Sequence, residues 1–155
     1  MAKTFTNTEF HLVFATARRR KTLRQEIRTE LYRTIAHTIT ARGGKVHAIG
    51  GVEDHVHIDL VIPVDQRACD MVAAIKSNSS TWMRQRPGGD PAFRWQKGYS
   101  LFSVCASHAK ALRSYINSQE AHHALNTAAD ELATLLRKHD IEFVASKLEA
   151  DGWFV

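Results

Sequence analysis

Residues 55–63 read His-Val-His-Ile-Asp-Leu-Val-Ile-Pro, an alternation of polar and apolar side chains that indicates a β-strand. The apolar side chains share one face of this strand: Val56, Ile58, Leu60 and Ile62. That face must pack against helices to leave water. His55, His57 and Asp59 lie on the opposite face, which we expect to be the more open side of the sheet. The strand therefore presents two imidazoles side by side on a face that is free for chemistry.

The segments before this strand predict two further strands and a helix. Residues 10–16 and 45–51 have strand-like patterns, and a turn near residues 51–54 would join the second of them to residues 55–63 as a hairpin. Between residues 16 and 45, apolar residues recur every four positions from Leu23 to Ile39, which is typical of an amphipathic helix. The pair Gly43-Gly44 then ends this helix, because glycine is the usual residue at a helix C-terminus.

The segments after the strand complete the pattern. Residues 67–86 predict a second helix, residues 101–106 a fourth strand, residues 107–122 a third helix and residues 128–138 a fourth. The order is βαββαβα, and a βαββαβ unit is the ferredoxin-like arrangement, an antiparallel sheet with helices on one face. We therefore expect a single α+β domain over residues 1–155, with a C-terminal helix and tail. The tail could form a short strand or dock its aromatic residues, Phe143, Trp153 and Phe154.

Composition and charge indicate a soluble globular protein with an anionic partner. Of 155 residues, 44% are hydrophobic and 24% are charged, and no apolar run is long enough to span a bilayer. The formal net charge is +5 and the pI is about 9.5, which favours nucleic acid as the partner. Cys69 and Cys105 have neither disulfide nor CxxC spacing, and the N-terminus lacks a signal peptide. We therefore expect a cytoplasmic protein with two reduced, buried cysteines.

The histidine pair could hold a metal ion. Alternate residues of a strand are about 6 to 7 Å apart on one face, so two neutral imidazoles could share one cation. However, with nine histidines in 155 residues such a pair is also common by chance. The spacing of His55 and His57 is therefore a weak signal until a second group joins it.

Tyr115 and Gln119 supply that second group. Positions four apart lie on one face of a helix, so the phenol and the amide would stack one turn apart. The phenol offers a nucleophilic oxygen, and the amide offers an oxygen ligand for a hard cation. The alternative is a core tyrosine and a solvated glutamine, although His108 and His122 make this helix face rich in polar rings.

In this order, these residues resemble the small single-tyrosine HUH transposases, a family of bacterial insertion-sequence transposases and their REP-associated relatives. The matching stretches are His11-Leu12-Val13-Phe14-Ala15-Thr16, Arg19-Arg20, Asp54-His55-Val56-His57, Lys76-Ser77 with Ser79-Ser80, residues 95–104 and residues 115–123. The resemblance covers about residues 8–142, with consistent spacings.

The resemblance implies the ferredoxin-like fold reached above and a role for each residue of the two motifs. It makes His55 and His57 the metal ligands, Tyr115 the nucleophile, and Gln119 a further ligand from the tyrosine helix. Members of the family are dimers that cut and rejoin single-stranded DNA near imperfect hairpins, and in some the tyrosine helix serves the partner's histidines. We therefore expect a homodimeric transposase whose partner is single-stranded DNA with a hairpin.

A covalent reaction explains why this chemistry uses a tyrosine. Attack by Tyr115 on a DNA phosphodiester would leave a 5′-phosphotyrosine and a free 3′-hydroxyl, which stores the bond for rejoining. A free phenol has a pKa of about 10, so a divalent cation that polarises the phosphate would assist it. Two imidazoles and one amide form an uncharged site, which should bind Mg²⁺ weakly and Mn²⁺ better.

One position departs from the family pattern. Asp59 stands where the family usually has an aliphatic residue, on the same face as the histidines. It could add a carboxylate near the metal or orient a ligand. The simpler interpretation is a partly exposed sheet residue with a hydrogen-bond partner.

DNA binding would use positive charge and aromatic stacking. The candidates are Arg18, Arg19, Arg20 and Lys21 for backbone phosphates, Lys76 and Lys97 as further cations, and Trp95 and Tyr99 for stacking on unpaired bases. The basic run could instead be a solvated turn, and Trp95 could instead pack in the core.

Two alternative functions stay open, and the residues argue against a third. A domesticated relative would keep the chemistry but act on dispersed genomic repeats, which the DNA flanking the gene would distinguish. A non-cutting DNA-binding regulator would keep all its activity after Tyr115→Phe. An RNA-binding module of this fold stacks bases on sheet aromatics, whereas the open face here carries His55, His57 and Asp59, which argues against that function.

Overall fold

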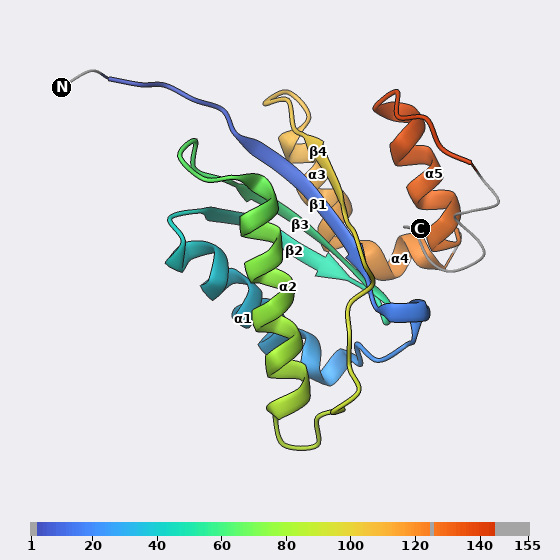
Figure 1. The fold of residues 1–155 in the computed structure, drawn as a ribbon. Helices are drawn as coiled ribbons and strands as arrows, with labels where there is room; N and C mark the ends of the chain where they lie inside the picture. The colour runs from blue at the N-terminus through green and yellow to red at the C-terminus, as the bar shows by residue number, and fades with distance from the viewer. Residues whose placement is uncertain (1–2, 125, 145–155) are drawn as a thin grey trace.

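The computed structural model describes residues 3–124 and 126–144, and its centre is a four-stranded antiparallel sheet (Figure 1). The strands are β1 (Glu9–Ala15), β2 (Lys45–Gly51), β3 (His55–Val61) and β4 (Ser100–Ser103), in the order β2-β3-β1-β4. Every neighbouring pair of these strands is antiparallel. With the helices between them, this is the ferredoxin-like βαββαβ arrangement, so the predicted α+β class is confirmed.

Two helices cover the apolar face of the sheet: α1 (Gln25–Ala41) and α2 (Ala68–Gln85). Their buried sides meet the alternate apolar residues of the central strands, as the helical and strand periods predict. The fully buried residues of this main core include Leu12, Phe14, Leu31, Ile35, Ile58, Leu60, Met71 and Ile75. This packing turns the histidines of β3 to the other side of the sheet.

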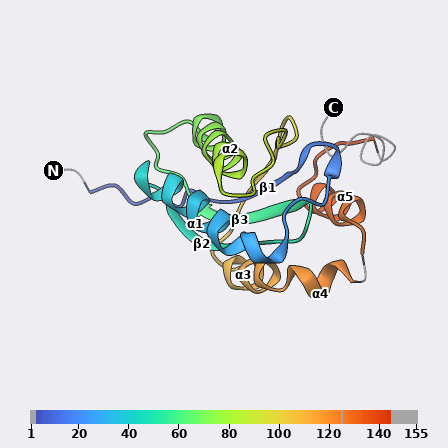
Figure 2. The same ribbon diagram turned by 90° about the horizontal axis from the view of Figure 1, so that it is seen from below.

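The histidine face is less open than the sequence suggested, because three helices lie over it: α3 (Ala109–Asn117), α4 (Gln119–His123) and α5 (Ala128–Lys138). Figure 2 shows α2 and α3 on opposite sides of the sheet. Helix α3 packs on β2 and β3, whereas α5 packs on β1 and β4 through a second apolar cluster. That cluster includes Val13, Ala15, Phe102, Ala128, Leu132 and Leu136. Helices α3 and α5 are amphipathic, and the sheet face buries their apolar sides.

The register of the sheet decides which side chains share the histidine face. In the β1–β3 pair, Val13 stands opposite His57 and His11 stands opposite Asp59. Directly opposite residues of an antiparallel pair point to the same face. His11 of β1 is therefore a diagonal neighbour of His57, on the same side of the sheet.

The structure divides one predicted helix. The sequence predicts one helix over residues 107–122, but α3 ends at Asn117 and α4 begins at Gln119, with a non-helical Ser118 (φ −115°, ψ 24°) between them. The Ser118 hydroxyl donates a hydrogen bond to the carbonyl oxygen of Ser114 at 2.8 Å. The backbone N–H of Ser118 donates to the carbonyl oxygen of Tyr115. This side-chain bond takes the place of the regular helical one, which is why serine weakens a helix interior.

Both cysteines are exposed free thiols, so the expected burial was wrong. Cys69 lies in the first turn of α2 on its solvent side, and Cys105 follows the end of β4. In the tail, Phe143 packs against the second apolar cluster, whereas Trp153 and Phe154 lie outside the described residues. No helix in the described part of the chain has the length and apolar character needed to cross a bilayer.

Candidate active site

The site begins with the two histidines of β3. His55 and His57 alternate along the strand, point away from the main core and have no exposed surface. Their ring centroids lie 5.1 Å apart, with the rings edge to face. Two imidazoles this close and this deeply buried form a fixed pair of nitrogen donors.

Each imidazole is held through its Nδ1 atom. His55 Nδ1 lies 2.7 Å from Oδ1 of Asp54, and His57 Nδ1 lies 2.8 Å from Nε2 of His11. An ionised carboxylate can only accept, so His55 donates to Asp54, and Nε2 of the neutral ring carries the lone pair that a ligand would use. Metal-binding histidines are typically held in this way through the other ring nitrogen. No role was predicted for His11 from the sequence, although the alternation of β1 places it on this face.

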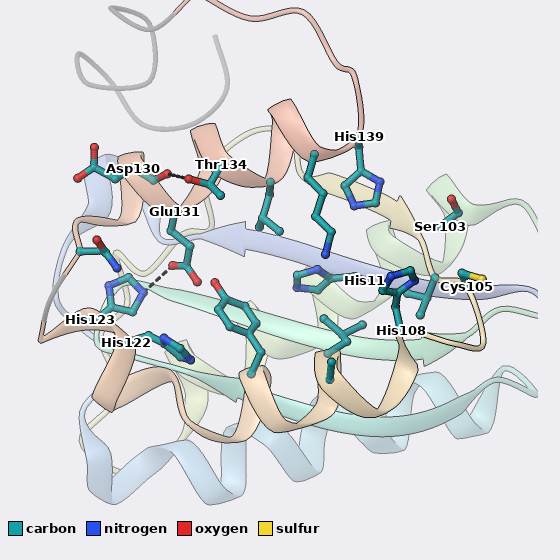
Figure 3. A pocket seen from close by; sticks show the side chains of 17 residues that line it. His11, Ser103, Cys105, His108, His122, His123, Asp130, Glu131, Thr134 and His139 are labelled. Carbon is teal, nitrogen blue, oxygen red and sulfur yellow. Dashed lines mark hydrogen bonds and ion pairs between the residues drawn. The ribbon is translucent and has the colours of Figure 1, made fainter.

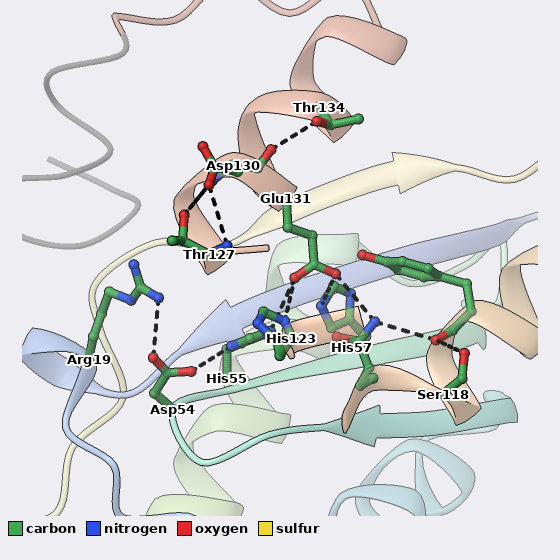
Figure 4. Close-up of polar contacts among 12 residues, drawn as sticks. Arg19, Asp54, His55, His57, Ser118, His123, Thr127, Asp130, Glu131 and Thr134 are labelled. Atoms are coloured by element: carbon green, nitrogen blue, oxygen red, sulfur yellow. Dashed lines mark hydrogen bonds and ion pairs between the residues drawn. The ribbon is translucent and has the colours of Figure 1, made fainter. Parts of the chain in front are cut away.

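Glu131 of α5 lies against the Nε2 atoms of both rings (Figure 4). Its Oε2 lies 3.5 Å from Nε2 of His55, and its Oε1 lies 3.4 Å from Nε2 of His57. A third imidazole, that of His123, places Nε2 2.7 Å from the same Oε2. The donor atoms of His55, His57 and Glu131 all lie within 4.8 Å of one another. The sequence carried no sign of a role for Glu131, because only the leucines of α5 marked that helix.

Gln119 brings an amide to the same place. It is the first residue of α4, its side chain is 2% exposed, and its Nε2 lies 3.3 Å from Oε1 of Glu131. Among the described residues, its buried Oε1 has no hydrogen-bond partner. A buried oxygen without a partner costs free energy, and a 180° rotation of the amide would exchange its oxygen and nitrogen and turn the oxygen toward Glu131, where it would suit a bound cation.

Tyr115 lies on α3 with its ring against the histidines. The ring centroid is 5.6 Å from that of His57, at an interplanar angle of 89°, and 6.5 Å from that of His11. Its other neighbour is His122 of α4, at 4.9 Å. Because the helix breaks at residue 118, Tyr115 and Gln119 do not stack on one helix. They meet instead where Nε2 of Gln119 lies 3.4 Å from the Tyr115 carbonyl oxygen.

Burial and charge shift the pKa values of this cluster in different directions. Burial alone would raise the pKa of Glu131, but its contacts with His55 and His57 lower it to about 2. Burial lowers the pKa of His57 below its ordinary value. Burial also lowers the pKa of His55, but Asp54 and Glu131 raise it by more, so the net shift is upward. Near neutral pH the cluster therefore holds an ionised carboxylate beside a neutral His57.

This donor set fits a divalent cation. Two imidazole nitrogens, a carboxylate oxygen and an amide oxygen are ligands that Mn²⁺ accepts, and the oxygens also suit Mg²⁺. The expected site was uncharged, whereas Glu131 adds one negative charge. Neither Cys69 nor Cys105 belongs to this cluster, which separates it from a closed zinc–cysteine site.

A cavity of about 690 Å³ opens beside the cluster, between α3 and α5. Tyr115, His123 and Glu131 line it, so the nucleophile and the carboxylate face the same space. Figure 3 shows His123 and Glu131 in contact at one end and His108 and Cys105 at the other. The volume lies in the range of ordinary ligand pockets, which gives a substrate phosphate room to reach the phenol.

Asp59 of β3 pairs with an arginine and does not join the donor cluster of the two histidines. Its side chain has no exposed surface, and its Oδ2 accepts a hydrogen bond from Nε of Arg113 at 2.9 Å. The same guanidinium donates through Nη2 to Oε1 of Glu9, also at 2.9 Å. Of the interpretations left open, the structure supports a sheet residue with a hydrogen-bond partner, although a buried one.

The predicted basic run lies at the end of the sheet that carries His55. It forms the short 3-10 helix η1 (Ala17–Arg19) and the turn after it, directly following β1. Arg19 Nη2 donates to Oδ2 of Asp54 at 3.2 Å, so it contacts the carboxylate that holds His55. The other three residues of the run are exposed. Arg19 thus joins the site, and the rest of the run lies at its edge.

The other four predicted DNA contacts lie apart from the cluster. Trp95 is 8% exposed and packs in the main core, and Tyr99 is partly buried against the same core. The ammonium group of Lys76 on α2 donates hydrogen bonds to two backbone carbonyl oxygens at 2.6 Å each, and burial lowers the pKa of Lys76 to about 8. Lys97 is exposed. Trp95, Tyr99 and Lys76 belong to the layer that packs on the opposite face of the sheet from the histidines.

Comparisons with known proteins identify a family with this arrangement. Residues 4–119 match the family model described as IS200-like transposase. A candidate transposase from Deinococcus radiodurans R1 has a similar structure, with a TM-score of 0.59, 24% sequence identity, and coverage of 77% of this chain and 98% of that one. A REP-associated tyrosine transposase, solved bound to a REP hairpin, gives a TM-score of 0.62 and 14% identity over 100% of this chain and 99% of that one. At these identities the likeness concerns the fold alone. No curated protein matches the chain.

Proposed function

The chain belongs to the IS200-like transposase family, and on this premise we propose that it cuts and rejoins single-stranded DNA through a covalent 5′-phosphotyrosine at Tyr115. One observation carries the proposal. The Tyr115 ring lies edge to face with His57, 5.6 Å between centroids, beside a buried cluster of metal-type donors. The nucleophile and Glu131, one member of that cluster, thus line one cavity.

His55, His57, Gln119 and Glu131 would hold a divalent cation, Mg²⁺ or Mn²⁺. When bound, the cation would polarise the scissile phosphate and stabilise the leaving oxygen. The imidazoles favour Mn²⁺, and the Glu131 carboxylate strengthens the site for either ion. Glu131 lies beyond residues 4–119, so it is outside the part of the chain that the family model matches.

The residues of this chain would each have a defined task in the reaction. The phenolic oxygen of Tyr115 bonds to phosphorus as its proton leaves to water, and the bond from phosphorus to the 3′-oxygen breaks. The leaving 3′-oxygen takes up a proton from water and becomes the free 3′-hydroxyl. Asp54 and His11 keep the two imidazoles in place through Nδ1. Helix α5 lies over the cluster and limits the access of bulk water, which would otherwise hydrolyse the phosphotyrosine ester.

The proposed partner is single-stranded DNA that forms a hairpin. The net charge of +5 and the exposed part of the basic run next to the site favour a DNA backbone. The REP-associated neighbour, which shares this fold, was solved with such a hairpin. The homodimer implied by the family resemblance stays a prediction.

The test is a search for the covalent intermediate. Purified protein is mixed with Mn²⁺ or Mg²⁺ and labelled single-stranded DNA from the flanks of its own gene, then run on a denaturing protein gel. We expect a metal-dependent protein–DNA band that Tyr115→Phe and His57→Ala abolish. Tyr32→Phe, which alters a partly buried tyrosine of α1 outside the site, should keep the band.

Two results would contradict the proposal. A band that survives Tyr115→Phe would place the covalent bond elsewhere, and cleavage without any band would indicate attack by water. DNA binding that is unchanged in Tyr115→Phe, with no cleavage by the native protein on these flanks, would favour the non-cutting regulator.

A further inference from the structure

Asp59 is a buried carboxyl group on the histidine face that the proposed reaction does not use. Its carboxylate, with no exposed surface, is bonded to Nε of Arg113 at 2.9 Å. Arg113 lies on α3, two residues before Tyr115. The contact therefore ties the helix of the nucleophile to the strand of the metal ligands.

The same arginine reaches a second strand. Its Nη2 donates to Oε1 of Glu9, the first residue of β1, at 2.9 Å, and the Glu9 side chain is 9% exposed. A guanidinium is planar and presents its donors in a fixed fork. Bonds from one fork to carboxylates on two neighbouring strands fix the direction of the side chain as well as its distance. This geometry restrains the rotation of α3 about its own axis.

A close backbone contact fixes α3 on the other side of Tyr115. A Cβ added at Gly50 of β2 would overlap the carbonyl oxygen of Ile116, so only glycine allows this approach. The Ile116 side chain is itself fully buried. Tyr115 is thus flanked by Arg113, which is bonded to β1 and β3, and by Ile116, which is pressed against β2.

We propose that Glu9, Asp59 and Arg113 form a clamp that positions Tyr115 at His55 and His57 of its own chain, so that the tyrosine acts in cis. The inference rests on the proposed function, because it concerns the placement of its nucleophile. It assigns a part to the residue that departs from the family pattern. The three clamp residues are positioning residues, since none of them lies in the donor cluster of His55, His57 and Glu131.

The first experiment tests cis action by mixing two inactive variants. His57→Ala keeps the tyrosine, and Tyr115→Phe keeps the histidines. We expect the mixture to form no covalent DNA band at any ratio, whereas the native protein forms one. A band from the mixture would mean that the tyrosine of one chain serves the histidines of another, which would overturn the inference.

The second experiment observes the clamp without relying on DNA cleavage. The chain has three tyrosines, so after labelling with 3-fluorotyrosine the Tyr115 fluorine resonance is assigned by its loss in Tyr115→Phe. We expect a single shifted resonance in the native protein, and a broadened one near the free-tyrosine position in Asp59→Asn. Because loss of one partner of an ion pair with a buried carboxylate can prevent folding, the double variant Asp59→Leu/Arg113→Leu, with a matched apolar pair, is measured as well.

The rate of band formation separates positioning from simple stability. Asp59→Asn and the double variant should form the band about 10- to 100-fold more slowly, with unchanged affinity for the DNA, because small displacements of a nucleophile have effects of this size. Glu30→Gln, which removes a surface ion pair with Arg33 on α1, should leave both the resonance and the rate as in the native protein. An unchanged resonance and rate in both clamp variants would refute the clamp.

The two proposals fail in different ways. If the native protein forms no band on any flanking DNA, the proposed function fails, and the fluorine spectra alone decide whether the clamp positions Tyr115. If the native protein forms the band and the clamp variants form it equally fast, the function stands and the clamp is wrong.

Discussion

His11 touches a candidate metal ligand without being one. Its Nε2 lies 2.8 Å from Nδ1 of His57, and the two rings are stacked with centroids 5.1 Å apart. Burial lowers the pKa of His11 well below its ordinary value, so the ring is neutral and can accept the bond from His57. His11→Leu would remove this acceptor. We expect the affinity for Mn²⁺, measured by calorimetric titration, to fall about 10- to 100-fold.

The control for this prediction is His37→Ala, which removes an exposed histidine from α1. It should bind Mn²⁺ as the native protein does. Native affinity in His11→Leu would show that His57 is held by the fold alone.

Tyr32 gives a pH-dependent prediction that is independent of the metal site. Burial raises its pKa from 10.0 to about 12, so the folded state keeps the phenol protonated where the unfolded chain ionises. A group whose pKa is higher in the folded state than in the unfolded chain stabilises the fold, and this contribution is complete when the pH is below the unfolded pKa. The contribution of Tyr32 therefore disappears as the pH rises from 10.0 to about 12. Across that window we expect the native free energy of unfolding to fall relative to Tyr32→Phe, by about 1 kcal/mol per pH unit. Urea unfolding at several alkaline pH values measures the difference, and parallel curves would contradict it.

At the residue scale, the sequence predicted the residues whose spacing is local. The alternation of β3 was enough to put His55 and His57 on one face. The same alternation in β1 could have indicated His11, because Phe10, Leu12 and Phe14 mark the opposite face of that strand. No such signal existed for Glu131. Its place depends on how α5 docks on β1 and β4, which is a long-range contact.

At the element scale, helix α3 is held to the sheet by the contact at Gly50. Gly50→Ala would push the added methyl into the Ile116 carbonyl and displace α3 from β2. We expect a loss of about 1–3 kcal/mol in the free energy of unfolding, which is typical of overpacking, measured by urea denaturation. The variant should also slow formation of the covalent DNA band, since Tyr115 precedes Ile116.

Gly88→Ala is a suitable comparison for that experiment. Gly88 has a φ of +70° in an exposed turn with no atom near an added Cβ, so alanine there strains only the backbone. It should lower stability while leaving band formation unchanged. An equal slowing in both variants would mean that Gly50→Ala acts through stability and not through α3.

Element boundaries were predictable where a local signal marked them. Helix α5 begins after Thr127, whose side chain forms a capping box with Asp130, and the predicted residues 128–138 match it. The break between α3 and α4 was not predicted, because the apolar pattern continues across it. It follows from the hydroxyl of Ser118, which bonds the carbonyl of Ser114. A side-chain hydrogen bond of this kind has no periodic signature.

On the scale of the whole molecule, the fold joins three functions at one end of the sheet. The end of β1 and the start of β3 are paired there, Ala15 opposite His55, so the basic run after β1 lies next to the histidines. Helix α5 covers the same region and carries Glu131. Cation site, nucleophile and positive charge thus lie together, although they come from separate parts of the sequence.

This arrangement predicts that the position of the positive charge, and not only its amount, controls DNA binding. The test is a comparison of two triple alanine variants, each of which would remove three exposed cations from a chain of net charge +5. One removes Arg18, Arg20 and Lys21 beside the site. The other removes Arg33, Arg42 and Lys45, which lie on α1 or follow it toward the opposite end of the sheet.

The measurement is the affinity for single-stranded DNA at several salt concentrations. Removing one cation that pairs with a DNA phosphate should reduce the slope of log K against log salt by about 0.7, so the first variant should have a slope smaller by about 2. The second variant should keep a slope close to that of the native protein, because its cations do not face the proposed DNA path. If the slope falls equally in both variants, the basic run has no special place in binding, and the strand must reach Tyr115 by another route.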